Sequence, residues 1–528
     1  MNLYFNPGNE LFQKVLNLPH YVDKTGLIEH LNRLCNTDMG YVCVTRPRRF
    51  GKTVTLKMLA AYYSKGCSSR DLFSKYEIAK MPSFEKELNK NNVILLDIQG
   101  LATLAKQEKI NVIDYINSKV TEEIIREYPN LKFSNPNLMM TCLEDIYKQT
   151  GEQFIALIDE WDAVYRVYPE DEELKKDYKE FLRPLFKSLS GNSICKLAYI
   201  TGILPIKKYG SQSELNNFDE IDMFSISRLQ KYIGFTANEV EKLCQETGMS
   251  IDEMRHWYDG YKIQGTGHLF NSNSVMRAID KQACMSYWSK TESFESLRKY
   301  INLNLNGLKD AVVELVSGKP VRLNSFEFAG DGENFSALND CLVYLVHLGY
   351  LSYDYENQTV NIPNNEVLIQ FKSALNGQTQ WGGLCRAIEE SFELLEATLN
   401  KDEEAVAGII EKIHDESIPA LSYNNENSLA AVVSLAYYAA KRDYRIRREQ
   451  PAGKGFADIV IFPLAYVNKP AIIIEMKIDS TPQRALKQII EKNYAAEFKN
   501  AFLVGINYSR KTKKHRVKII TKEEIELR

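Results

Sequence analysis

A short segment near the N-terminus, Thr45–Thr53, constrains this chain more than any other feature. It reads Thr-Arg-Pro-Arg-Arg-Phe-Gly-Lys-Thr and follows the apolar run Tyr41–Val44. A strand that enters a tight loop and then a helix is typical of a phosphate-binding loop, G-x-x-x-x-G-K-[ST], in which backbone N–H groups hold phosphates, Lys52 reaches the β/γ oxygens and Thr53 holds Mg²⁺. Arg46 replaces the first glycine of the pattern. The site is therefore atypical and needs support from elsewhere in the chain.

Two later apolar runs give that support. Phe154–Ile158 is typical of a parallel strand buried on both faces, and it ends in Asp159 and Glu160. At the carboxyl end of such a strand, Asp159 suits a Mg²⁺ site and Glu160 suits a base that polarises the attacking water. Lys196–Ile200 ends in Thr201, whose hydroxyl we expect near the γ-phosphate. Each piece alone also fits a loop or a helix N-cap, but together they predict ATP or GTP binding. The residues predicted to bind nucleotide are Arg49, Phe50, Gly51, Lys52, Thr53, Asp159 and Thr201.

Length and composition place the chain among ordinary globular proteins. A chain of 528 residues is too long for a single hydrophobic core and suits three domains. Its contents of 44% hydrophobic and 26% charged residues are ordinary for globular proteins. We find neither a transmembrane-length apolar stretch nor the pattern of a signal peptide. The nine cysteines are scattered without a C-x-x-C pair, so neither a disulfide framework nor a zinc site is indicated. We expect a cytoplasmic protein that does not contact membranes.

The charge is spread unevenly along the chain. The formal net charge is −3, but residues 441–528 carry +10 and the first 440 residues carry −13. A basic C-terminal segment on an acidic body is one signature of a nucleic-acid contact. A lysine-rich solvated surface has the same composition, so charge alone does not decide between them.

The pattern of strands and helices predicts an α/β protein with three domains. Residues 1–230 alternate strands with amphipathic helices, which predicts a P-loop domain whose parallel sheet has helices on both faces. Residues 231–385 predict a helical lid with a winged-helix-like part, and residues 386–528 predict a compact α/β module. The family resemblance given below implies that the first of these is an AAA-like ATPase domain and the last a restriction-endonuclease-like domain. Expected strands of the first domain are Tyr41–Val44, Val93–Ile98, Phe154–Ile158 and Leu197–Thr201, and expected helices are Lys24–Leu34, Val54–Ser64 and Ile110–Glu127. Later expectations include a hairpin of Tyr350–Tyr355 and Thr359–Ile362 and the helices Ser428–Arg442 and Gln483–Glu497.

A second constellation of polar residues lies in the third domain. Asp458 begins one expected strand and Glu475 ends the next, so an antiparallel pair brings both carboxylates to one end of the sheet. Glu475 and Lys477 are two residues apart and share a face of the strand. Two carboxylates and a lysine form a site for Mg²⁺ or Mn²⁺, in the D…E-x-K arrangement of phosphodiester hydrolysis.

Two flanking residues fit the same chemistry. Glu426, ahead of a helix, could add a metal ligand, and Gln488, on the following helix, could orient a water or phosphate. A strand edge of alternating charge is the plain alternative for Glu475 and Lys477, but the apolar run before them indicates a buried strand, where charge is costly unless functional. The predicted catalytic residues are Glu160, Asp458, Glu475, Lys477 and Gln488, and the predicted metal ligands are Thr53, Asp159, Glu426, Asp458 and Glu475.

Nearly the whole chain resembles the bacterial AAA-ATPase-like proteins that end in a PD-(D/E)XK nuclease domain. The segments that carry the resemblance are Tyr21–Thr25, Arg46–Thr53, Ile158–Asp162, Tyr199–Gly202, Trp257–Tyr261 and Phe270–Ser272. Within this family Arg46 is a regular trait, whereas Trp161 replaces the usual tyrosine and Ala457 replaces the proline before Asp458. The resemblance implies an ATP-binding module fused to a nuclease-type fold, with mobile-element or phage-defence biology as one conceivable role.

Two functions of different classes follow from these patterns. The first is an enzyme that couples ATP hydrolysis to metal-dependent cleavage of nucleic acid, DNA before RNA. The alternative is a nucleotide-switched DNA-binding or regulatory protein whose nuclease-like domain is a non-catalytic docking module. Either protein could form homo-oligomers.

Overall fold

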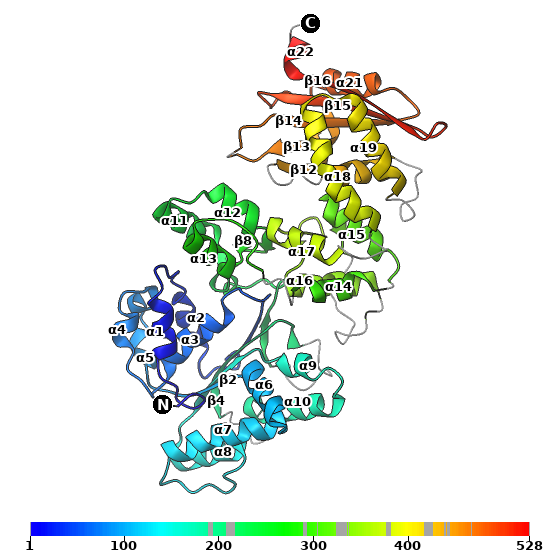
Figure 1. Ribbon diagram of the computed structural model, residues 1–528. Coiled ribbons are helices and arrows are strands. Elements are labelled where there is room, and N and C mark those ends of the chain that lie inside the picture. The colour runs from blue at the N-terminus through cyan, green and yellow to red at the C-terminus, as the bar shows by residue number, and fades with distance from the viewer. Residues whose placement is uncertain are drawn as a thin grey trace.

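The computed structural model describes residues 2–187, 194–206, 217–288, 293–303, 305–323, 335, 337–375, 382–416, 426–437, 440, 444–465 and 467–526. Figure 1 shows the N-terminal sheet with its helices, a mostly helical middle region, and a C-terminal sheet module at the far end from the N-terminus. Within these ranges no helix is both long and apolar enough to cross a bilayer.

The first sheet is parallel, as predicted, and its strand order is β2-β3-β4-β1-β5. Its strands are β1 (Tyr41–Thr45), β2 (Asn92–Asp97), β3 (Phe154–Asp159), β4 (Cys195–Gly202) and β5 (Asp219–Ile221). The four predicted strands are confirmed with ends shifted by one or two residues. Strand β5 was not expected, because Asp-Glu-Ile has no apolar run. The order places β4 between β1 and β3, so the carboxyl ends of all three meet at one edge.

Helices cover both faces of this sheet because successive strand side chains alternate between them. Val42 and Val44 pack with α1 (Glu10–Leu16), α2 (Gly26–Leu34) and α3 (Lys52–Tyr63). Tyr41 and Cys43 face the opposite side. The helices on that side are α6 (Ile98–Glu108), α7 (Val112–Glu127), α8 (Met139–Thr150), α9 (Ala163–Val167) and α10 (Glu172–Phe186), and the short helices α4 (Arg70–Phe73) and α5 (Phe84–Glu87) follow α3.

The middle region is helical with two small antiparallel sheets. Its helices are α11 (Ala237–Thr247), α12 (Ile251–Tyr258), α13 (Ser272–Lys281), α14 (Ser293–Ile301), α15 (Leu308–Ser317), α16 (Leu338–Leu348) and α17 (Asn365–Leu375). One sheet has the order β10-β11-β9, with β9 (Val321–Arg322), β10 (Ser352–Asp354) and β11 (Thr359–Asn361), and it contains the predicted winged-helix-like hairpin. The other, β6-β8-β7, comprises β6 (Phe235–Thr236), β7 (Tyr261–Ile263) and β8 (Gly267–Phe270). Its strands are too short for a sequence periodicity, and it was not expected.

The C-terminal module has one mixed sheet, in the order β12-β13-β14-β15-β16. Strands β14 and β15 are parallel, with α21 as their crossover, and the other pairs are antiparallel. The strands are β12 (Tyr444–Ala452), β13 (Gly455–Pro463), β14 (Ala471–Ile478), β15 (Ala501–Ser509) and β16 (Lys514–Thr521), and the helices are α18 (Gly382–Leu399), α19 (Glu403–Glu416), α20 (Glu426–Ala436), α21 (Pro482–Glu491) and α22 (Lys522–Glu526).

Two predicted helices of this module are too long. The helix expected to reach Glu497 ends at Glu491, because Asn493 takes a left-handed φ of 54° and Tyr494 then turns into the core beneath α21. The helix expected over Ser428–Arg442 begins at Glu426 and ends at Ala436.

Candidate functional sites

The loop between β1 and α3 has the backbone of a phosphate-binding loop. Gly51, immediately before the helix, has a φ of 89°, a left-handed conformation that glycine adopts without strain. Lys52 begins α3, and its Nζ donates to the carbonyl oxygens of Arg46 at 2.9 Å and Pro47 at 3.1 Å. Burial lowers the pKa of Lys52, and the acidic residues nearby oppose that shift. The lysine is therefore held inside the loop, at the place where phosphates are expected.

Asp159 connects three of the predicted residues. Thr53 Oγ1 donates to its Oδ2, and Thr201 Oγ1 donates to its Oδ1, each at 2.6 Å. Burial raises the pKa of Asp159, whereas these two hydroxyl donors lower it. Carboxylate and hydroxyl oxygens are hard ligands that suit Mg²⁺. Thr201 is fully buried and its hydroxyl contacts Asp159, and its contact with a γ-phosphate stays a prediction.

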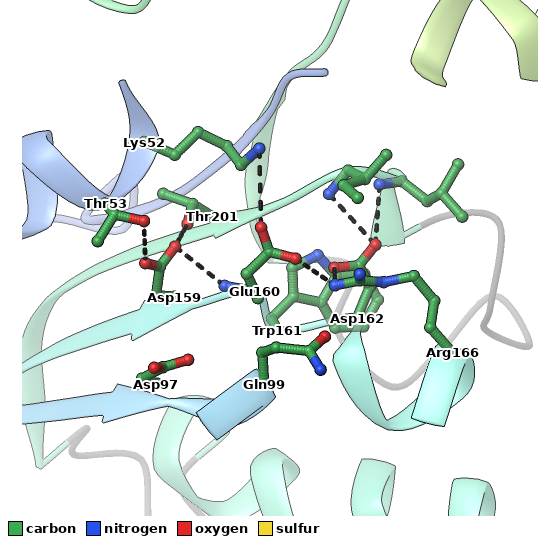
Figure 2. A network of polar contacts seen from close by, with 12 residues as sticks. Lys52, Thr53, Asp97, Gln99, Asp159, Glu160, Trp161, Asp162, Arg166 and Thr201 are labelled. Carbon is green, nitrogen blue, oxygen red and sulfur yellow. Dashed lines mark hydrogen bonds and ion pairs between the residues drawn. The ribbon is translucent and has the colours of Figure 1, made fainter. Parts of the chain in front are cut away.

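Glu160 is held between two cations, as Figure 2 shows. Its Oε2 forms an ion pair with Arg166, and its Oε1 lies 3.9 Å from Lys52 Nζ. Burial alone would raise the pKa of Glu160, but Lys52, Arg166 and Arg48 together outweigh it and hold the pKa below its usual value. The carboxylate is therefore ionised at neutral pH, as a base for water activation must be.

Arg166 is a part of this site that sequence reasoning missed. Its guanidinium also lies 3.6 Å from Asp162, which is fully buried and accepts the N–H groups of Ile203 and Leu204 at the end of β4. The spacing of four residues between Asp162 and Arg166 was the available signal, since such pairs meet on one helix face.

The other residues of the Arg-Pro-Arg-Arg-Phe segment attach the loop to the middle region. The Phe50 ring meets the Tyr261 ring edge to face at 5.0 Å between centroids. A Cβ on Gly349 would lie 2.6 Å from the Pro47 side chain, so that contact requires glycine. Arg46 is fully buried, and burial lowers the pKa of its guanidinium to about 10. Arg46, which replaces the first glycine of the phosphate-binding pattern, is therefore an interior side chain of the protein.

Arg49 links the loop to the middle region through the backbone of one residue, Tyr287. Its φ is 74°, and its Nη1 donates to the Tyr287 carbonyl at 2.8 Å. The N–H of Tyr287 donates to Glu366 on α17 at 2.6 Å, and Asn273 N donates to the Arg49 carbonyl at 3.2 Å. The loop and α17 therefore contact the backbone carbonyl and the backbone N–H of the same residue, Tyr287.

A cavity of about 730 Å³ opens at this edge of the sheet. One end is polar and includes Gly51, Lys52, Thr53, Asp159 and Glu160. The other end is largely apolar, and sequence reasoning did not assign its role; it includes Val15, Tyr21, Met58, Phe235 and Met276. A phosphate-binding end and an apolar end in one cavity suit a nucleotide. Figure 2 places Asp97 and Gln99, which also line the cavity, beside Asp159 at the end of β2.

The second predicted constellation is assembled on β13 and β14. Their register, Ile459 opposite Ile474, places Asp458 opposite Glu475 as expected. Asp458 Oδ2 accepts the N–H of Met476 at 2.7 Å, and Lys477 Nζ lies 3.0 Å from Glu475 Oε1. Burial first, and then Asp458, raise the pKa of Glu475 to about 7. Its Oε2 is buried and has no hydrogen-bond partner among the residues that the structure describes, and such an oxygen suits a cation.

The two flanking residues are less fully described. Glu426 begins α20, and its side chain lies outside the described part of the structure. Gln488 lies on α21, and its Nε2 donates to the Tyr494 hydroxyl at 3.4 Å. Among the described side chains, no group of three or more His, Cys, Asp or Glu could hold a metal ion. Asp458 and Glu475 are thus the two carboxylates that the described part brings together at this point.

Comparisons with known proteins identify the same two regions. Residues 11–211 match a family model described as predicted AAA-ATPase, and residues 424–518 match the PD-(D/E)XK nuclease superfamily. A curated relative, described as an uncharacterized protein in the vnfD 5'region of Azotobacter chroococcum mcd 1, is 23% identical over 522 residues, which cover 93% of each chain.

Solved structures align with this chain only distantly. The ORC2 protein of Aeropyrum pernix, in ADPNP-ADP complexes, aligns with 68% of this chain and 94% of its own at 10% identity and a TM-score of 0.26. The ORC1 protein of the same organism, in complex with DNA, aligns with 93% and 98% at 9% identity and a TM-score of 0.22. At these scores neither likeness carries an argument about this chain.

Proposed function

Because this chain joins a predicted AAA-ATPase segment to a PD-(D/E)XK nuclease segment, we propose that it is an ATP-hydrolysing enzyme with a metal-dependent DNA endonuclease site. The observation that carries the proposal is the buried Glu475 carboxylate, which faces Asp458, contacts Lys477 and has one oxygen without a partner. Burying that charge beside another carboxylate is costly unless a cation is bound there.

In the ATPase site, each residue has a distinct task. Lys52 exchanges the carbonyls of Arg46 and Pro47 for phosphate oxygens, and Thr53 with Asp159 holds Mg²⁺, which neutralises charge on the phosphates when bound. Glu160 accepts a proton as water attacks the γ-phosphorus and the bond to the β-phosphate oxygen breaks. Its ionised state, maintained by Lys52 and Arg166, suits that task.

In the nuclease site, Asp458 and Glu475 would hold a divalent cation, whose chemistry would be to activate a water and to stabilise charge on the scissile phosphate. Lys477 lies on the same face of β14 and offers its ammonium group to that phosphate or to the nucleophile. Hydrolysis adds the water oxygen to phosphorus and releases the leaving oxygen as a hydroxyl.

The Lys477→Ala variant tests the nuclease assignment. We expect it to lose cleavage of supercoiled plasmid in Mn²⁺ while its ATP turnover stays nearly unchanged, since the two sites share no residue. Lys487→Ala, which removes an exposed lysine paired with Glu491 on α21, is the matched control. Plasmid cleavage by highly purified Lys477→Ala protein at the wild-type rate would contradict the assignment.

A second candidate function is a nucleotide-switched DNA-binding protein whose C-terminal module docks without cutting. The observation in its favour is that the described residues supply two acidic metal ligands and no third. Plasmid nicking in Mg²⁺ and Mn²⁺, with and without ATP, separates the two. DNA binding without nicking under every condition supports the docking function.

A further inference from the structure

We propose that the hairpin between β15 and β16, residues 509–516, binds the sugar-phosphate backbone of duplex DNA beside the Glu475–Lys477 site. The inference rests on the proposed nuclease function and names the element that holds its substrate. Figure 1 shows the red turn between these strands projecting from the C-terminal module.

The hairpin has a strongly basic composition. The nine residues Arg510–Lys518 contain six Lys or Arg and no Asp or Glu. Two of these cations are already engaged, since Arg510 pairs with Asp479 and Lys518 pairs with Glu403. The remaining four, Lys511, Lys513, Lys514 and Arg516, are exposed, and none has an ion-pair partner among the described residues. Exposed positive charge of this density attracts a polyanion.

The strand register aims part of this charge at the predicted cleavage site. Lys477 pairs with Asn507, and Asn507 pairs with Arg516, so the three form one row across β14, β15 and β16. Residues paired directly across strands share a face of the sheet. Arg516 therefore lies on the face of Lys477, about 10 Å away across two strand spacings. A DNA strand that enters the cleavage site from this side passes over the hairpin.

The hairpin is also fixed to the end of β14. Arg510 donates its backbone N–H to Asp479 Oδ1 at 2.9 Å and its Nε to Oδ2 at 2.6 Å, and Asp479 directly follows β14. Lys513 N closes the turn on the Ser509 carbonyl at 2.7 Å. The cations are thus presented from an ordered turn at a set distance from Glu475 and Lys477, which a loose basic tail could not do.

The test compares two double variants that each lose two charges. Lys514→Gln/Arg516→Gln removes cations from the hairpin, and Lys469→Gln/Lys499→Gln removes them from the opposite end of the same sheet, next to the starts of β14 and β15. Binding of the full chain to fluorescently labelled linear duplex DNA is measured by anisotropy in EDTA, so that metal-dependent cleavage cannot occur. Salt is varied from about 50 to about 200 mM, where phosphate contacts dominate the change in affinity.

We expect the hairpin variant to bind at least about tenfold more weakly, and the slope of log affinity against log salt to fall by about 1.8, from about 0.9 per lost contact. The control variant should bind like the wild type. Equal affinity of both variants, or no binding of duplex DNA by the wild type, would overturn the inference, as would tighter binding of a single-stranded RNA. If the hairpin variant fails to fold, Lys511→Gln/Lys513→Asn tests the other two exposed cations of the hairpin, which lie at its turn.

The cleavage activity is tested apart from the hairpin. Wild-type protein that binds DNA through the hairpin but does not cleave it in Mn²⁺ would refute the nuclease function and leave the hairpin inference standing. If the hairpin variant cleaves DNA like the wild type and Glu475→Gln does not cleave it, the nuclease function would stand and the hairpin inference would be refuted.

Discussion

Single residues at the end of β3 determine how the ATPase site is prepared before nucleotide arrives. Glu160 has a left-handed backbone, with a φ of 51°, and its side chain is directed by Arg166 on one oxygen and by Lys52 near the other. Arg166 in turn is placed by the buried Asp162. The proposed base is therefore oriented by contacts within the chain.

The Arg166→Gln variant should lose ATP turnover with little change in ATP affinity. Hydrogen bonds to charged groups contribute about 1.5–3 kcal/mol, which corresponds to a roughly 10- to 100-fold loss in kcat. Steady-state ATPase assays and a separate binding titration distinguish kcat from affinity. Arg126→Gln, which removes an exposed arginine paired with Glu122, should have wild-type kinetics. A rise in kcat for Arg166→Gln would instead mean that Arg166 restrains the base.

Gly202, in the Thr201-Gly202 pair, is required by a close approach. A Cβ there would lie 2.6 Å from the Trp161 ring, which is itself buried. We expect Gly202→Ala to destabilise the protein by roughly 1–3 kcal/mol, the usual cost of overpacking a core. Gly408→Ala in α19 meets no atom within 4 Å and should stabilise by about 0.5–1 kcal/mol. Urea unfolding of both variants checks the pair, and equal effects would refute the packing argument.

The sequence predicted the positions of single residues correctly where those residues lie at the end of a strand. The pairing of Asp458 with Glu475 follows from their spacing on adjacent strands, and Asp159 and Glu160 follow from the apolar run before them. It failed for Arg166, because that contact depends on the turn between β3 and α9. The γ-phosphate contact of Thr201 stays a prediction, since the structure shows only that its hydroxyl donates to Asp159.

At the scale of elements, the contact between α19 and β16 contains a buried pair of histidines. His414 Nδ1 and His515 Nε2 are 2.7 Å apart, the Tyr508 ring lies against both, and Glu411 accepts the backbone N–H of His515. Burial first, and then His414, lower the pKa of His515 from 6.5 to about 3. This histidine is therefore neutral in the folded protein over most of the acidic range.

That shift predicts a loss of stability in acid. The unfolded chain binds a proton below pH 6.5 and the folded chain does not, so the stability that is present above this pH is lost as pH falls toward about 3. The free energy of unfolding should fall by up to about 1.4 kcal/mol per pH unit for this proton. Urea unfolding followed by circular dichroism measures the slope. His515→Phe should reduce it, whereas His268→Gln, at a half-exposed histidine, should not; an unchanged slope in His515→Phe would contradict the prediction.

Strands that contain a run of four or more apolar residues were predicted well, and strands with a shorter or interrupted run were not. The long runs of β3 and β14 indicated their strands almost to the residue. Strands β6 and β9, of two residues each, owe their existence to pairing with distant segments, which no local pattern reveals. The end of α21 depended on Tyr494 turning into the core, a tertiary preference that overrode helical periodicity.

For the whole molecule, a continuous set of contacts connects the phosphate-binding loop to the C-terminal module. Arg49 donates to the Tyr287 carbonyl, the Tyr287 N–H donates to Glu366 on α17, and α17 contacts α18 of the C-terminal module. Helix α15 of the middle region also packs against α20. We therefore predict that a change in the loop on nucleotide binding acts on contacts that continue toward the Glu475–Lys477 site.

The Arg49→Gln variant should uncouple the two ends of this set. In the wild type we expect duplex DNA affinity to differ by about fivefold or more with and without a non-hydrolysable ATP analogue, a typical coupling of about 1 kcal/mol. The ratio should approach one in Arg49→Gln, while Arg126→Gln keeps the wild-type ratio. Anisotropy titrations at fixed salt give both values. If the ratio of DNA affinities with and without the analogue is as large in Arg49→Gln as in the wild type, Tyr287 does not connect the loop to the C-terminal module.

A coupling between the two sites through the backbone of Tyr287 must act in both directions. Whatever factor ATP applies to the affinity for DNA, DNA must apply to the affinity for ATP, because the free energy around the cycle is conserved. If ATP raises the affinity for DNA, a DNA-bound chain binds nucleotide more tightly than one in free solution. At a fixed ATP concentration, binding to DNA would then by itself decide which protein molecules carry nucleotide. Bound nucleotide would mark the molecules that have met DNA.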